Sequence, residues 1–221
     1  MLSGSIKTVL TCILCMVQLF AQGSPPASRA VPENDPEGCY ELGRKYDEGD
    51  GVDMDSEEAA KWYRKAADAG HTQAQYRLGY LCNKGYGAEY NPETAAVWFR
   101  KAAAAGHTDA MYDLALILYK GLTEEANNAE ALRFFTKAAE KGHQEAQYKT
   151  AMMYLNGEGT QEDAKKAFAW MKKCAEQEHV NAQYELANMY YEGIGVEPDE
   201  EQGDYWYYRA EENELFEMFM Y

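Results

Sequence analysis

The apolar positions of this chain recur at a fixed interval, and this interval organises most of the sequence. Residues 74–109 show the pattern, and a shift of 36 residues superposes four further segments on it without a gap: 38–73, 110–145, 146–181 and 182–217. Positions one, five and nine of each segment are mostly apolar, as in Ala110, Leu114 and Leu118. Positions spaced i, i+4, i+8 lie on one face of a helix. The pattern predicts that each segment opens with an amphipathic helix.

Small residues define the packing and the end of this first helix. Position six is always glycine or alanine, so a neighbouring helix can approach closely at this point. Position twelve is always glycine, where a helix of about 11 residues should end in a left-handed cap. These glycines are Gly49, Gly85, Gly121, Gly157 and Gly193.

A second helix is predicted after a short loop. It opens with acidic or proline-containing stretches such as NPETA and EPDEE, which suit the start of a helix. Position twenty-five is aromatic in every segment, and position twenty-eight is lysine or arginine. Because one helix pair cannot cover its own apolar face, the five pairs are expected to stack. The predicted fold is all-α, a right-handed α-solenoid of five 36-residue helix-turn-helix repeats.

The chain before the repeats has a different character. Residues 1–23 join the basic Lys7 to an apolar run and end in small residues, which predicts a secretory signal peptide. The run is shorter than the roughly 20 residues of a membrane span, so an uncleaved anchor is only the alternative. Residues 24–37 hold four of the six prolines and are expected to form a disordered leader. The sequence therefore predicts a secreted or periplasmic protein with no stable membrane insertion after cleavage.

The end of the sequence is unusually apolar. Residues 218–221 form a tail after repeat five, and six of the seven residues in 215–221 are apolar or aromatic. A solenoid has to cover the apolar face of its final repeat. We expect this segment either to fold back over Tyr205, Trp206 and Tyr207 or to be covered by a second molecule. Fold-back in a monomer is favoured, because the eleven acidic residues of 182–217 would repel an identical end across a two-fold axis.

The net charge argues against nucleic-acid binding, and the positions of the cysteines exclude a disulfide in every repeat. The formal net charge is −16, and Arg209 is the one basic residue of 182–217. Such a surface does not bind nucleic acid electrostatically. Cys39, Cys82 and Cys174 occupy three different repeat positions, so a disulfide that recurs with the repeat is excluded. Buried thiols are expected instead.

The repeated residues carry a recognisable signature. It reads A-x-Y-x-L-G-x-x-Y/C-x-x-G-x-G, followed by A-x-x-W-[YF]-x-K-A-A-x-x-G-H. This resembles the Sel-one-like repeat family, relatives of the tetratricopeptide repeat, over residues 38–217. The departures are Thr123 at the second loop glycine, Thr150 at the leucine, and Glu178 and Glu214 at the closing glycine. Family members are typically adaptors that assemble protein complexes, so the resemblance implies a protein-binding function.

Two patterns suggest metal binding, and both have a structural explanation. His71, His107, His143 and His179 recur at one repeat position, but packed helices place such positions about 10 Å apart. Ligands of one zinc ion must each lie within about 2 Å of it. The acidic loop 50–57 lacks the glycine and the spaced glutamate of an EF-hand. We predict helix-terminal histidines, a structural loop, and no metal or other cofactor.

An enzymatic alternative arises from the resemblance. A cysteine-rich secreted branch of the family has been linked to penicillin recognition or hydrolysis, which leaves a β-lactamase-like or cell-wall-fragment-binding protein open. Ser56 is the only serine of the repeats, and Glu57-Glu58-Ala59 follow it in place of Ser-x-x-Lys. Cys82 and Cys174 occupy apolar positions where packing explains them. The sequence therefore predicts no catalytic residues. A structural unit that assembles through its ends is the other alternative.

The candidate binding site lies on the first helices. By resemblance to tetratricopeptide repeats, positions three, seven, ten and eleven should line a concave groove. Position three is always tyrosine, and positions seven and ten are apolar in the central repeats, although a helix apolar on both faces is normally covered on both. The predicted groove residues for a protein or peptide partner are Tyr76, Tyr80, Tyr112, Leu116, Tyr119, Tyr148, Met152, Leu155, Tyr184 and Tyr191. The alternative for position three is that its tyrosines stack on adjacent first helices.

Overall fold

The structure is a computed structural model that describes residues 35–123 and 127–220. This part of the chain forms ten α-helices and no strand. The first helices of the pairs are α2 (Pro36–Glu48), α4 (Thr72–Lys84), α6 (Thr108–Tyr119), α8 (Gln144–Asn156) and α10 (Val180–Glu192). The second helices are α3 (Ser56–Asp68), α5 (Pro92–Ala104), α7 (Asn128–Glu140), α9 (Ala164–Ala175) and α11 (Glu200–Met220). The predicted signal peptide and residues 24–34 of the predicted leader lie outside the described residues.

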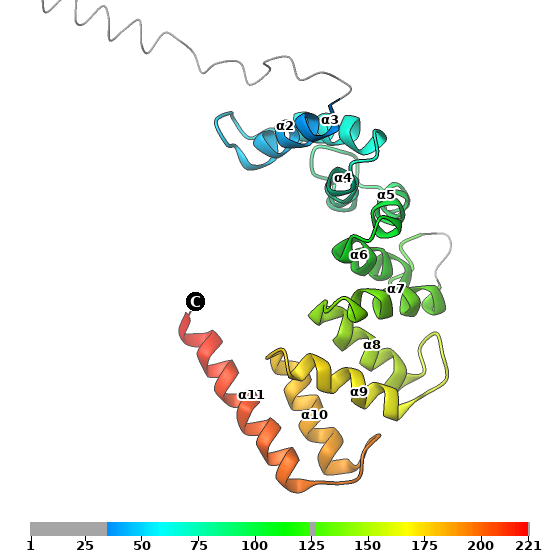
Figure 1. The fold of residues 1–221 in the computed structure, drawn as a ribbon, viewed down its shortest axis with the longest axis vertical. Coiled ribbons are helices and arrows are strands. Elements are labelled where there is room, and N and C mark those ends of the chain that lie inside the picture. The colour runs from blue at the N-terminus through cyan, green and yellow to red at the C-terminus, as the bar shows by residue number, and fades with distance from the viewer. Residues whose placement is uncertain (1–34, 124–126, 221) are drawn as a thin grey trace, which may run out of the picture.

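Each helix packs against the one before it and the one after it, and the pairs follow a curved path (Figure 1). The all-α solenoid of five helix pairs is therefore confirmed. The first helix of each pair begins two residues before the predicted repeat boundary. Pro36 starts α2, with Asp35 as its N-cap. Four of the five predicted glycines end their helices with φ between 69° and 73°, whereas α6 ends at Tyr119, before Gly121.

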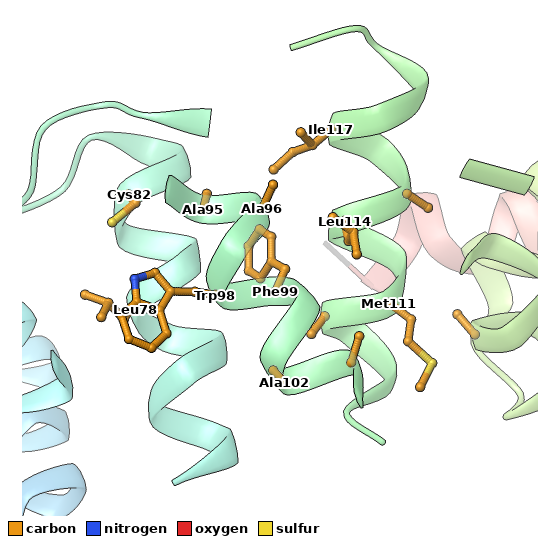
Figure 2. Close-up of a cluster of buried hydrophobic side chains, with 14 of the residues drawn as sticks. Leu78, Cys82, Ala95, Ala96, Trp98, Phe99, Ala102, Met111, Leu114 and Ile117 are labelled. Carbon is orange, nitrogen blue, oxygen red and sulfur yellow. The ribbon is translucent and has the colours of Figure 1, made fainter. Parts of the chain in front are cut away.

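In the first two repeats, the glycine at position six packs against an aromatic ring from the second helix of the same pair. A Cβ added to Gly79 would lie 2.8 Å from the ring of Phe99, which is completely buried. The Cβ of a residue at Gly43 would lie 2.7 Å from the ring of Tyr63. Figure 2 shows Phe99 in this core, between α4 and α6, with Leu114 on the side of the next repeat. The prediction of close approach at position six is confirmed, and the approaching group is this ring.

The recurring histidines are helix caps that also join consecutive repeats. His71, His107, His143 and His179 are the N-caps of α4, α6, α8 and α10. In each case Nδ1 accepts a hydrogen bond from a backbone N–H three residues later, at 3.1–3.3 Å. An accepting Nδ1 places the ring proton of a neutral histidine on Nε2. Nε2 in turn faces a polar side chain 34 residues earlier, as His107 faces Gln73 at 2.8 Å. The prediction of helix-terminal histidines is confirmed.

A second inter-repeat contact depends on close approach of the backbone at the loop glycine. A Cβ on Gly87, which has φ 61°, would lie 2.0 Å from the backbone oxygen of Ser56 in the preceding repeat. Gly159 and Gly195 approach the preceding repeat in the same way. Gly51 occupies this position in the first repeat, and a Cβ there would meet nothing within 4 Å. The close approach therefore occurs at the loop glycines of repeats two, four and five, whereas repeat three has Thr123 at this position.

The last helix differs from the sequence-based expectation. The sequence predicts that residues 215–221 fold back over Tyr205, Trp206 and Tyr207, but α11 continues without a break to Met220. Residues 211–220, EENELFEMFM, contain no glycine or proline, and the side chain of Asn213 donates to Gln183 at 3.0 Å, so the helix continues through them. Leu215, Phe216 and Met218 remain 51 %, 65 % and 66 % exposed. The fold-back prediction is wrong, and the C-terminal end of α11 extends beyond α10 (Figure 1).

The final repeat covers its end with carboxylates instead. Asp204 and Glu211 stand where the other repeats have buried or partly buried apolar residues, such as Leu132 and Ala139. Tyr191 donates a hydrogen bond to Asp204 at 2.7 Å, and Tyr184 donates one to Glu214 at 2.8 Å. These bonds give the outer face of the repeat a polar surface, as the end of a solenoid requires.

The loop-glycine contact makes a direct prediction. The substitution Gly87→Ala should lower the free energy of unfolding by about 1–3 kcal/mol more than Gly51→Ala, because this is the usual cost of overpacking. Both glycines have positive φ, 61° and 74°. The free-energy cost of placing alanine in this left-handed backbone conformation is therefore similar in the two variants. Urea unfolding followed by circular dichroism measures the difference. Equal destabilisation of both variants would contradict the inter-repeat contact.

The histidine caps predict an acid-sensitive junction. Burial lowers the pKa of His107, which faces Gln73 and Tyr76, with Asp109 raising the pKa and Arg77 lowering it. Stability from neutral His107 is therefore fully present above the unfolded pKa of about 6.5 and is lost as the pH falls through the lower folded value. His107→Asn retains a capping side chain without this titration. Its melting temperature should fall less between pH 7 and pH 5 than that of the unchanged protein. Parallel pH profiles would show that His107 does not titrate with folding.

Candidate peptide-binding face

The predicted groove residues all lie on the first helices of repeats two to five. We call the surface formed by these ten side chains the first-helix face: Tyr76 and Tyr80 on α4, Tyr112, Leu116 and Tyr119 on α6, Tyr148, Met152 and Leu155 on α8, and Tyr184 and Tyr191 on α10. None of them is fully buried. Tyr119 and Tyr191 are the most accessible, at 36 % and 39 % exposure. The face therefore presents apolar and aromatic surface to solvent.

The position-three tyrosines contact the histidine caps. Tyr76 stacks on His107 with ring centroids 4.4 Å apart, and Tyr112 on His143 and Tyr148 on His179 do the same at 4.4 Å and 5.0 Å. Each histidine caps the adjacent first helix. The tyrosines at position three therefore stack on adjacent first helices, as the alternative interpretation predicted. Their rings are partly exposed to solvent.

The two tyrosines of the last first helix are engaged within their own repeat. Tyr184 and Tyr191 donate to Glu214 and Asp204, and these hydrogen bonds raise the pKa of each phenol to about 12. The first repeat uses position ten in the same way, because Tyr63 donates to Asp47 at 3.1 Å. Position ten is thus held by internal hydrogen bonds at both ends of the solenoid.

The central repeats place three predicted residues around one pocket. Tyr119, Tyr148 and Met152 line a cavity of about 180 Å³ between α6, α7 and α8. Its other lining residues are Phe135, Lys149, Met153, Asn156 and Glu158. The ring of Tyr119 meets that of Phe135 edge-on, with centroids 6.3 Å apart. The pocket therefore combines an aromatic and methionine wall with a few polar groups, a lining like that of ligand sites, but it is smaller than their usual volume of roughly 300–1,000 Å³.

The polar side chains of the pocket differ in how they are engaged. Glu158 accepts a hydrogen bond from Asn156 at 3.2 Å, and its hydrogen bond with Tyr119 raises the pKa of that phenol. Lys149 takes part in none of the salt bridges formed within residues 35–123 and 127–220. Among these described residues, the ammonium group of Lys149 is thus an unpaired charge beside the apolar wall.

The remaining predicted residues do not line this pocket. Leu116 and Leu155 are half-buried against the core, and Lys84 lies over the ring of Tyr80 at 5.7 Å. Between α4 and α6, burial raises the pKa of Asp113 to about 6, while its hydrogen bond from Tyr76 lowers it. The structure therefore brings Tyr119, Tyr148 and Met152 together and spreads the other residues along neighbouring helices.

Sequence reasoning missed part of the pocket. Phe135 and Met153 are buried core residues that also form its floor, and neither belongs to the predicted set. Asn156 stands at position eleven, which the resemblance includes in the groove, yet its polar character keeps it off that set. Lys149 stands at position four, one residue after the predicted tyrosine, and only the helix geometry shows that it shares the pocket.

The groups considered for chemistry have structural roles. Cys39, Cys82 and Cys174 are buried thiols, and burial raises the pKa of Cys82 and, to about 12, that of Cys174. A reactive cysteine needs the opposite shift. Asp55 of the acidic loop is the N-cap of α3 and accepts from two backbone N–H groups at 3.0 Å. These positions supply helix caps and packing.

The described helices hold neither a metal-binding cluster nor a membrane span. Within residues 35–123 and 127–220, no group of three or more histidine, cysteine, aspartate or glutamate side chains is placed to hold a metal ion. In the same stretches, none of the helices has both the length and the apolar composition needed to cross a bilayer.

A solved structure with the same helix arrangement supports the repeat assignment. A Sel1 repeat protein from Oxalobacter formigenes is 32 % identical, with a TM-score of 0.78 over 84 % of this chain and 76 % of that one. The protein c5321, a protective antigen of uropathogenic Escherichia coli strains, is 28 % identical with a TM-score of 0.48 over 85 % of this chain. This chain spans half of the length of c5321. No curated protein sequence gives a match.

The repeats themselves match a family model. The model for the Sel1 repeat fits residues 36–71, 72–107, 108–143, 144–179 and 180–214 in unbroken succession. These limits agree with the observed helix starts, including Pro36. The similarity predicted from the signature is confirmed, and the chain belongs to the Sel1 repeat family.

Proposed function

We propose that this protein is an exported, non-catalytic scaffold that binds a protein or peptide segment on its first-helix face. Sel1 repeat proteins generally mediate protein–protein interaction, and this supports the binding class. The export part rests on the sequence of residues 1–23 and on no structural observation. The binding part rests on the central repeats.

The observation that carries the binding proposal is the pocket of Tyr119, Tyr148 and Met152. Helices α6 and α8 already bury one apolar face in the solenoid, with Leu114, Ile117 and Met153 nearly inaccessible. Their second apolar face remains in solvent and frames the pocket. Leaving such surface uncovered is unfavourable by roughly 25 cal/mol per Å², so a partner that covers it gains that free energy.

The side chains that line the pocket also indicate what kind of segment would bind there. A methionine and aromatic wall accepts an aliphatic or aromatic anchor side chain, and such anchors commonly dominate binding energy. The unpaired ammonium group of Lys149 adds a preference for a nearby carboxylate on the partner. A short segment with an apolar anchor and an acidic neighbour is therefore the expected ligand.

The double substitution Tyr119→Ser and Met152→Ser tests this function. Removing both side chains should weaken capture of a partner at least tenfold, which corresponds to about 1.4 kcal/mol, while circular dichroism remains unchanged. The matched control is Tyr86→Ser with Met54→Ser, because both side chains are exposed in loops outside the face. Proteins enriched by the unchanged chain are identified by quantitative mass spectrometry of affinity eluates. A partner that both double variants retain would place the binding site elsewhere.

A further inference from the structure

The C-terminal half of α11 is an apolar segment that its own chain leaves largely exposed. The second helices α3, α5 and α7 have 13 residues each, whereas α11 has 21. The eight additional residues extend it by about 12 Å at 1.5 Å per residue. Leu215, Phe216 and Met218 lie on this extension and are more than half exposed. Three large apolar side chains that are exposed close together indicate a surface that a binding partner covers.

The same helix is strongly acidic. Helix α11 contains seven acidic residues and one basic residue, Arg209, which lies 3.6 Å from Glu178. An identical α11 is therefore repelled by it, and a two-fold contact between two such helices is unfavourable. The surface that covers Leu215, Phe216 and Met218 must be apolar and must not be acidic.

The central first-helix face has both properties. Helices α4, α6 and α8, with Lys120 directly after α6 and Glu158 shortly after α8, carry four basic residues, Arg77, Lys84, Lys120 and Lys149, and four acidic ones. Two of these acidic residues, Asp109 and Glu145, face the caps His143 and His179. In a chain with a net charge of −16, this surface around the pocket has balanced charge and is much less acidic than α11.

We infer that the α11 extension of one copy binds the first-helix face of a second copy, so that two chains exchange their C-terminal segments. This inference rests on the proposed function, because it names the ligand of the same face. Leu215, Phe216 and Met218 of one copy cover Tyr119, Tyr148 and Met152 of the other, and acidic residues of α11 approach Lys149. The exchange is reciprocal, so a two-fold axis satisfies both extensions and closes the assembly. It also keeps the two acidic helices apart.

Sedimentation velocity of the full chain over a range of concentrations tests the exchange. The unchanged protein should be a dimer, whereas two variants should each be monomeric: the tail variant Leu215→Ser/Phe216→Ser/Met218→Ser and the face variant Tyr119→Ser/Met152→Ser. Each should raise the dissociation constant of the dimer at least tenfold. The tail substitutions lie at exposed positions, so folding should be unaffected. The control variant Met54→Ser/Tyr86→Ser should dimerise like the unchanged protein.

Mixing the two variants, each with its own fluorophore, provides the decisive arm. The tail variant keeps an intact face and the face variant keeps an intact tail, so one of the two contacts can form again. A mixed dimer should appear, with weaker association than that of the unchanged protein. A monomeric unchanged protein, dimers of either variant alone, or a mixture that stays monomeric would overturn the exchange.

These outcomes separate the exchange from the proposed function. If the exchange fails while Tyr119→Ser/Met152→Ser still loses a foreign partner, the face binds that partner and the tail plays no part. If the exchange succeeds while the same variant retains every foreign partner, the face serves self-association alone.

Discussion

Each helix pair has two apolar surfaces, one that faces the preceding pair and one that faces the next pair. Exposing either surface to water is unfavourable. Every internal junction covers them with the same contacts. Position eight of the next first helix supplies a buried side chain, Leu81, Ile117, Met153 or Met189, and its N-cap histidine bridges to the preceding repeat. In the first repeat this position is the exposed Lys45, where no repeat precedes it. The contacts between consecutive repeats therefore set the spacing of the helices. They also determine that polar residues replace the buried apolar ones at the ends of the solenoid.

A fixed spacing also positions the side chains that point away from the junctions. At the ends of the solenoid, position ten is tied down by hydrogen bonds, between Tyr63 and Asp47 and between Tyr191 and Asp204. In the centre, Leu155 occupies this position without any hydrogen-bonding group, and Tyr119 bonds to Glu158 of the next repeat instead of to its own second helix. The apolar surface that remains available is thus concentrated in repeats three and four. Binding and self-association are both assigned to this region because it is apolar, accessible and far less acidic than the rest of the chain.

The period of the sequence was sufficient to predict the fold, because each helix, cap and small residue was observed five times. It did not predict the end of α11. Glu178 and Glu214 both replace the closing glycine, yet Glu178 adopts φ 67° in the turn after α9 while Glu214 remains helical. The difference lies in the residues immediately after them: His179 caps a new helix, whereas residues 215–217 contain no capping residue. The pocket was only partly predictable, since Lys149 and Phe135 join it through packing between helices that repeat positions alone do not describe.

Binding of an acidic, apolar segment by the central first-helix face links the pocket, the local charge and the α11 extension. A zero-length carbodiimide cross-link between a lysine and a carboxylate measures this contact directly in a mixture of ¹⁵N-labelled and unlabelled chains. The exchange of C-terminal segments predicts isotopically mixed cross-links that join Lys149, Lys84 or Lys120 to carboxylates within residues 211–217. Cross-links from these carboxylates to lysines of the second helices, such as Lys61 or Lys172, with none to the first helices, would contradict it.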